Sequence, residues 1–225
     1  MFSSVTSQHV TNVALLVPED PRWLFSAPRV LPAIDRACDE IKRRQLLTST
    51  TLRVRTADSS CHIGVAMHHA IDLFMNGTTN LFLGPCCDYA VAPVARQAVF
   101  WNVPIVTPGA MSADFTRKKL SEYRLLTRIS ADFNSLATAL AAVLDHYDWH
   151  KVKIVYQYDG FSRIATKFCH LAADSLHRFL MARGNITQDY FKMMGDGDRL
   201  LLGRMHEEIG VRFAGQSHFA LVQTV

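Results

Sequence analysis

No stretch of this sequence reaches the roughly 18 consecutive apolar residues that a membrane-spanning helix requires. The first ten residues contain neither the basic start nor the apolar centre of a secretory signal peptide, so we interpret residues 1–10 as an N-terminal tail. Hydrophobic residues still make up 49% of the chain and charged residues 20%, a balance that supports a buried core and argues against disorder. We expect a globular protein that meets a membrane only through a segment outside this chain.

The motifs of several large enzyme classes are also missing. The chain has no G-x-G-x-x-G, no Walker loop and no G-x-S-x-G, and its acidic residues are not clustered as acid–base catalysts would be. Residues 195–198 fail the EF-hand pattern, because leucines at positions 200–202 replace the later calcium ligands. These absences favour a binding module without catalytic residues over an enzyme.

Metal and nucleic-acid sites lack their usual patterns as well. His68 and His69 are expected on different helix faces, no C-x-x-C occurs, and the adjacent Cys86 and Cys87 suit zinc poorly. The net charge is only +4, and the densest basic run, residues 42–44, falls at an expected helix end, where cations complement the helix dipole. We therefore expect no metal ion, no organic cofactor and no nucleic-acid partner.

The chain has five cysteines, an odd number that argues against a complete set of internal disulfides. Two N-glycosylation sequons begin at Asn76 and Asn185, each in a polar stretch between apolar segments where a glycan could project. Together with the placement of the cysteines, the sequons favour an oxidising compartment.

Short apolar runs alternate with longer amphipathic segments along most of the chain. Strands are expected at residues 13–17, 52–57, 81–83, 103–106, 152–156, 190–194 and 218–222. Helices are expected after Ser26, with Pro28 in the first turn, and at residues 61–75, 89–100, 133–147, 164–181 and 200–209. The first helix is expected to turn Val30, Ile34, Ala37 and Ile41 toward the core.

This alternation predicts an α/β fold of two lobes, each with a parallel sheet flanked by helices. Residues 107–128 form the longest region without clear periodicity, which suits a connection between lobes. We place lobe 1 at residues 11–128 and lobe 2 at residues 129–225.

Two loops carry the most specific pattern. Residues 58–61 and 84–87 each follow an expected strand and open an expected helix, and neighbouring parallel strands deliver such loops to one sheet edge. Cys61 could then pair with either Cys86 or Cys87, which would stabilise the fold by about 3 kcal/mol; the alternative is three reduced core thiols. Free N–H groups of the 84–87 turn, with the Ser59 hydroxyl beside them, form either a small-anion site or an ordinary turn.

Aromatic residues gather at a second strand end. Tyr156 and Tyr158 lie at the carboxyl end of an expected strand, the edge where open α/β sheets bind ligands, and Phe161 and Phe168 follow. Such a group is either part of the core or an apolar binding surface.

The chain also shows a resemblance to a known protein family. The segments that carry it are residues 24–34, 83–96, 101–104, 121–128 and 149–156. The second contains the highly specific G-P-x-C-x-Y-A-x-A-P-V-x-R. In order and spacing these segments resemble the extracellular ligand-binding domain of natriuretic peptide receptors, whose fold is the type I periplasmic-binding-protein fold. Residues 24–26 look more like the clearance type of receptor than the cyclase type.

The resemblance implies roles for particular residues. It pairs Cys61 with Cys87 in a disulfide, and it assigns a chloride ion to Ser59 and to the main-chain N–H groups of Cys86 and Cys87. Peptide contacts are implied for Tyr89, Tyr156, Tyr158, His170 and Asp174. A dimer surface is implied near Phe100 and Trp101, where exposed aromatics would suit an interface.

The chain also departs from the family pattern. Aromatic residues often follow the second-lobe cysteine in the family, whereas His170 and Leu171 stand here. The family pairs Cys169 with a cysteine in a later strand, and this chain has none there. We therefore expect a C-terminally truncated chain that lacks the later part of both lobes.

The resulting prediction is a hormone-binding domain on the extracellular face of the plasma membrane, which binds a peptide across a homodimer. Full-length relatives carry either a separate cytoplasmic guanylate cyclase or a short tail. The first alternative is a sensor for amino-acid-like small molecules on the same fold, although Ser130 and Tyr156 near the hinge do not make a full clamp. The second is a cytosolic α/β enzyme with reduced cysteines.

Overall fold

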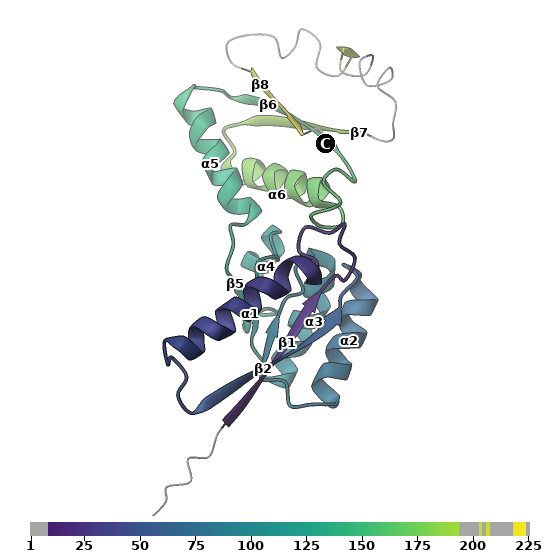
Figure 1. Ribbon diagram of the computed structural model, residues 1–225. Coiled ribbons are helices and arrows are strands. Elements are labelled where there is room, and N and C mark those ends of the chain that lie inside the picture. The colour runs from purple at the N-terminus through teal and green to yellow at the C-terminus, as the bar shows by residue number, and fades with distance from the viewer. Residues whose placement is uncertain (1–8, 194–202, 204–205, 208–217, 224–225) are drawn as a thin grey trace, which may run out of the picture. The chain divides into compact units, whose positions relative to one another are not determined.

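The computed structural model in Figure 1 describes residues 9–193, 203, 206–207 and 218–223. The chain divides into two compact units. Unit 1 comprises Met1–Ala110, Arg117–Ser130 and Arg163–Ala165, and unit 2 comprises Met111–Thr116, Ala131–Ser162 and Thr166–Val225. The main boundary between the units follows Ser130, two residues after the boundary expected at residue 128. In addition, residues 111–116 belong to unit 2 and residues 163–165 belong to unit 1.

Unit 1 is built on a parallel sheet of five strands in the order β2-β1-β3-β4-β5. The strands are β1 (His9–Val17), β2 (Thr50–Asp58), β3 (Leu81–Leu83), β4 (Ile105–Thr107) and β5 (Leu126–Arg128). All side chains from Val13 to Val17 are buried, because β1 lies inside the sheet and both of its faces are covered. The strand begins at His9, so the expected tail of ten residues is too long by two.

Three helices cover this sheet: α1 (Ala27–Arg43), α2 (Ile63–Met75) and α3 (Asp88–Trp101). Figure 1 shows α1 on one side of the sheet and α2 and α3 on the other. This arrangement follows from right-handed crossovers, since β1 connects to β2 in one direction along the sheet and the later strands follow in the other.

Helix α1 begins where the sequence predicts, although the expected side-chain cap is absent. Ser26 is its N-cap residue, yet the buried hydroxyl of Ser26 caps no backbone N–H and has no hydrogen-bond partner in the described residues. The prediction of a core face was partly wrong, because Ala37 is exposed. Ile34 packs on the buried side chains of β1 as predicted, and Leu31 packs there as well.

The segment expected to be a connection, residues 107–128, holds two further elements. Helix α4 (Ala113–Arg117) and strand β5 lie within it, and β5 adds a fifth strand by pairing Leu126 with Ile105. Tyr123 is fully buried before β5, with the Arg96 guanidinium 5.0 Å from its ring centre. The prediction was wrong here because these short elements, unlike the apolar run at residues 81–83, show no hydrophobic pattern that marks them.

Unit 2 contains a parallel three-stranded sheet in the order β7-β6-β8. Its elements are α5 (Phe133–His146), β6 (Lys151–Gln157), α6 (Phe168–Arg183), β7 (Thr187–Met193) and β8 (His218–Gln223). Val152, Ile154 and Tyr156 of β6 form a buried cluster with Leu176 and Leu180 of α6. The fold class predicted from the sequence, parallel sheets flanked by helices, is confirmed.

Two helices expected in unit 2 differ from the prediction or cannot be compared with it. Helix α6 begins at Phe168, four residues later than expected, because Phe161 and Lys167 adopt left-handed backbone conformations that no helix continues. The helix expected at residues 200–209 lies largely outside the described residues. Within the described part of the chain, no helix combines the length and apolar character needed to cross a membrane.

Candidate ligand-binding site

The two cysteine loops meet at the carboxyl edge of the unit 1 sheet. Cys61 and Cys87 form a disulfide with their Cα atoms 5.4 Å apart, and both side chains are buried. The prediction that the loops follow neighbouring strands was wrong, because β1 lies between β2 and β3. The loop after β2 crosses the end of β1, where the Ser59 N–H donates to the Val17 carbonyl over 3.1 Å.

Asp58 shapes the first of these loops. Its Oδ1 accepts hydrogen bonds from the backbone N–H groups of Ser60, at 2.7 Å, and Glu19, at 2.9 Å, and its Oδ2 accepts one from the Ser60 hydroxyl. Burial raises the pKa of Asp58, but these hydrogen bonds outweigh the burial and hold the pKa below its usual value. Ser60 and Cys61 can therefore keep the positive φ angles, 48° and 50°, that aim the Cys61 sulfur at Cys87.

The second loop is tied to the end of β4. The fully buried Thr107 hydroxyl donates to the Pro85 carbonyl over 2.7 Å and accepts from the Gly109 N–H over 2.9 Å. Gly109 is required there, because a Cβ would collide with the backbone of Cys86. The Cys86 thiol packs against Leu15 and Val17 of the core, and burial raises its pKa to about 12, so Cys86 stays an inert thiol.

The residues implied for an anion lie in this edge. Ser59 is fully buried, and its Oγ is 3.5 Å from the Cys61 N–H. Cys87 is the N-cap residue of α3, and in the described part of the chain neither Cys86 nor Cys87 has a recorded acceptor for its N–H. Asp88 follows as a buried carboxylate in the first turn of α3 and shares the positive end of that helix.

The residues implied for peptide contact fall in both units. Tyr89 belongs to unit 1, on the first turn of α3, and is 36% exposed. Tyr156, Tyr158, His170 and Asp174 belong to unit 2, on β6, just after β6, and on the first turns of α6. The fold of unit 2 therefore brings Tyr156, Tyr158, His170 and Asp174 together near the carboxyl end of β6.

Three rings form the centre of this unit 2 group, which we call the aromatic cluster (Tyr156, Tyr158 and His170). The Tyr156 hydroxyl lies 3.3 Å from His170 Nδ1, and the rings of Tyr158 and His170 are 4.7 Å apart. Tyr156 is 5% exposed and belongs to the core, whereas Tyr158 and His170 are half-buried. Tyr156 is therefore a core residue, while Tyr158 and His170 remain accessible to solvent in part.

Charged side chains surround the aromatic cluster. The Lys192 and Lys167 ammonium groups lie 3.9 Å and 5.2 Å from the centre of the Tyr158 ring. Asp174, one turn after His170, pairs with Arg178 at 2.9 Å. The sequence analysis missed both lysines, because three different elements carry residues 158, 167 and 192 and no sequence spacing connects them.

The surroundings of His170 shift its pKa. Burial lowers its pKa, the nearby Asp174 raises it, and Lys192 and Lys167 lower it further, with a net decrease. Burial likewise raises the pKa of Tyr156. The site thus offers aromatic faces, an imidazole and two cations, which suits recognition of a ligand with apolar and polar groups side by side.

The structure also places the remaining residues of interest. Asn76, after α2, and Asn185, after α6, are exposed. Phe100 is 82% exposed, but Trp101 is half-buried and stacks on Phe74 with 4.5 Å between ring centres, so the expectation of two exposed aromatics holds for Phe100 alone. Cys169 is a buried free thiol beside Gly160.

Comparison with known proteins gives the family. The family described as "Receptor family ligand binding region" matches residues 29–186, which include the disulfide, the 84–87 turn and the aromatic cluster. The chain belongs to this receptor family. The resemblance identified from the sequence is therefore confirmed, and the parallel sheets with flanking helices agree with it.

Curated relatives of this receptor family add detail. The chain is 33% identical to atrial natriuretic peptide receptor 3 of Homo sapiens over 187 residues, which cover 80% of this chain and 34% of that protein. It is 32% identical to receptor 3 of Bos taurus over the same length, and 28% identical to receptor 2 of Anguilla japonica over 148 residues, or 63% of this chain and 14% of that protein. The chain spans about a third of the length of the receptor 3 relatives it matches.

Proposed function

We propose that this chain is the hormone-binding part of a natriuretic-peptide-type receptor and acts as a binding module without catalysis of its own. The observation that carries the proposal is the aromatic cluster at the carboxyl end of β6, in a chain of this receptor family. Binding energy at protein interfaces concentrates in a few residues, among which tyrosine is enriched, and Tyr158 is a half-buried tyrosine at this strand end. The similar receptors are natriuretic peptide receptors, so the small-molecule alternative is not favoured.

The proposal predicts a specific loss on substitution of Tyr158. The Tyr158→Ala variant should bind atrial natriuretic peptide at least tenfold more weakly, about 1.4 kcal/mol, because the ring that contacts His170, Lys167 and Lys192 is lost. Isothermal titration calorimetry of the whole chain measures this, and circular dichroism checks the fold. The matched control is Tyr147→Ala, an exposed tyrosine of unit 2 after α5, which should keep wild-type affinity. A folded wild-type chain that binds no natriuretic peptide would contradict the proposal.

Several features support a role outside the cell. The buried Cys61–Cys87 disulfide requires an oxidising environment, and both sequon asparagines, Asn76 and Asn185, are exposed. We place the chain on the extracellular face of the plasma membrane. A shift in gel mobility after glycosidase treatment of protein secreted from cells reports whether the two asparagines are modified.

We further propose that peptide binds across a homodimer. The support is Phe100, an 82% exposed phenylalanine at the end of α3, beside the Phe74–Trp101 stack. Sedimentation velocity of the Phe100→Asp variant tests this: a wild-type dimer that the substitution leaves intact would remove Phe100 from the interface.

Chloride is the small ligand that the sheet edge could hold. The Ser59 hydroxyl and the N–H groups of Cys86 and Cys87 would donate hydrogen bonds to the chloride ion, which would take part in no reaction. Replacing chloride by gluconate should lower the stability of the wild type, by about 1.4 kcal/mol if chloride had been at ten times its dissociation constant. Urea unfolding measures the difference. It should vanish in Ser59→Ala and persist in Ser121→Ala, an exposed serine of the same unit.

A further inference from the structure

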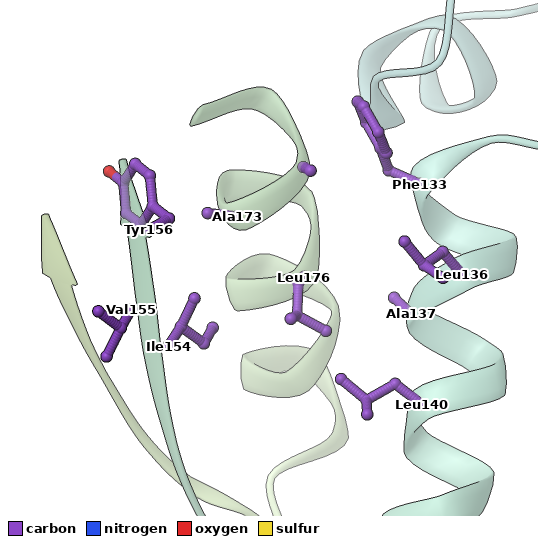
Figure 2. Close-up of a pocket in the computed structure, with 10 residues that line it drawn as sticks. Phe133, Leu136, Ala137, Leu140, Ile154, Val155, Tyr156, Ala173 and Leu176 are labelled. Carbon is purple, nitrogen blue, oxygen red and sulfur yellow. The ribbon is translucent and has the colours of Figure 1, made fainter. Parts of the chain in front are cut away.

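A cavity of about 230 Å³ lies within unit 2, between helices α5 and α6 and strand β6. Figure 2 shows Phe133, Leu136 and Leu140 pointing from α5 toward α6, while Ile154 and Tyr156 point from β6 toward the same helix. All of these residues belong to unit 2, so the cavity is a feature of that unit alone. None of the roles proposed above uses it.

The cavity exists because small residues face it from both helices. Ala137 on α5 and Ala173 on α6 are buried in its lining, 1% and 7% exposed. The space opens to solvent beside Leu136, which is 63% exposed, so it is a partly open pocket and not a sealed void. A leucine at either alanine would occupy part of the space, and the alanines leave it open.

The chemistry of the lining is apolar. Apart from the hydroxyl of Tyr156, which is engaged with His170, the lining side chains are hydrocarbon, and the backbone of β6 is paired with β7 and β8. A buried water needs two to four polar partners, which these side chains do not offer. An apolar cavity of roughly 150 Å³ engineered in another protein stays dry and binds benzene.

We propose that this cavity is a binding site for a compact, uncharged apolar molecule between benzene and indole in size. Leu136, which is 63% exposed in the first turn of α5, marks the side from which such a molecule enters. The molecule would lie among Phe133, Leu140 and Leu176 and against the ring of Tyr156. A charged or strongly polar ligand is excluded, since no partner faces it and its desolvation would be uncompensated.

Tyr156 connects this cavity with the aromatic cluster. Its ring lines the cavity while its hydroxyl contacts His170. We expect an occupant that packs on this ring to change peptide affinity, and such coupling would give the cavity a regulatory role. This regulatory role rests on the proposed function, whereas occupancy of the cavity does not.

The test uses the whole chain with benzene and indole as probes, in the absence of peptide. Saturation-transfer difference NMR should detect binding, and nuclear Overhauser effects should run from the probe to the methyl groups of Leu136, Leu140 and Ile154. The Ala137→Leu variant should raise the dissociation constant at least tenfold, because its side chain fills the site. Ala139→Leu, at an exposed alanine of the same helix, should not change it.

Two results would overturn the inference: no binding of either probe to wild-type protein, or equal binding to Ala137→Leu. If Ala137→Leu does not fold, Ala173→Leu replaces it, and the contacts in the wild type still decide, since contacts to other methyl groups would place the probe elsewhere. Titrating peptide with and without saturating indole then tests the coupling. A failure of peptide binding alone would affect the proposed function and leave the cavity result intact.

Discussion

Removing the Cys61–Cys87 disulfide should lower the free energy of unfolding by about 3.5 kcal/mol, the largest single effect expected in this chain. The bridge joins residues 26 apart in sequence, and the value is the loop-closure entropy that the unfolded chain regains without it. The measurement is urea unfolding of the double variant Cys61→Ala, Cys87→Ala, which keeps both buried positions apolar.

The control for this experiment is Cys38→Ala. Cys38 is a free, partly exposed cysteine of α1, and its substitution should change the unfolding free energy by less than about 0.5 kcal/mol. If the double variant were as stable as the wild type, the bridge would not constrain the unfolded chain, and its role would be limited to shaping the loops that hold Ser59, Cys86 and Cys87.

The second large effect concerns a lysine inside the unit 2 sheet. The Lys153 side chain on β6 is 1% exposed, and its ammonium group pairs with the Asp189 carboxylate on the adjacent position of β7. The Asp189→Ala variant should lose about 2 kcal/mol of stability, because a buried ammonium loses a charged hydrogen-bond partner. The Lys153→Met variant should lose less, because it removes the buried charge together with its desolvation cost.

The pH dependence gives this prediction a second readout. The hydrogen bond from Lys153 holds the pKa of Asp189 below its usual value, more than burial raises it. The stability that the pair contributes is therefore present above the pKa of the unfolded chain, near 3.9, and is lost as pH falls through the lower pKa of the folded chain. Urea unfolding between pH 7 and pH 3 should show a smaller acid-induced loss in Asp189→Ala than in the wild type. A wild type and variant with the same pH profile would contradict the assignment.

The periodicity of apolar residues was sufficient for most of the fold. Runs such as residues 13–17 and 152–156 are uniformly apolar or nearly so, which is how strands buried on both faces read, and the structure has strands there. The three-residue strand at 81–83 was predicted, but α4 and β5 were expected as a connection, and Ala37 was expected in the core face of α1 but is exposed. Strand β5 depends on long-range pairing, because its partner is the neighbouring strand β4.

The candidate site, like the fold, could be predicted only in part from the sequence. Tyr156 and Tyr158 could be named from the sequence because they follow a recognisable strand, and the carboxyl ends of parallel strands are where such sheets bind ligands. Lys167 and Lys192 could not be named, because their positions beside Tyr158 result from the packing of the segments around β6. The same holds for the cavity, since the sequence shows alanines at 137 and 173 but not that they face one space.

What the sequence alone determined is most of the order of strands and helices and the α/β class, because local patterns of burial and turn chemistry encode these along the chain, while the receptor family followed from the resemblance of segments such as residues 83–96. Only the tertiary structure decided that the cysteine loops meet across the end of β1, that two lysines flank Tyr158, and that α5 and α6 leave a cavity between them. These are distances between residues far apart in sequence, and they are set by how side chains pack rather than by the local pattern that places each element.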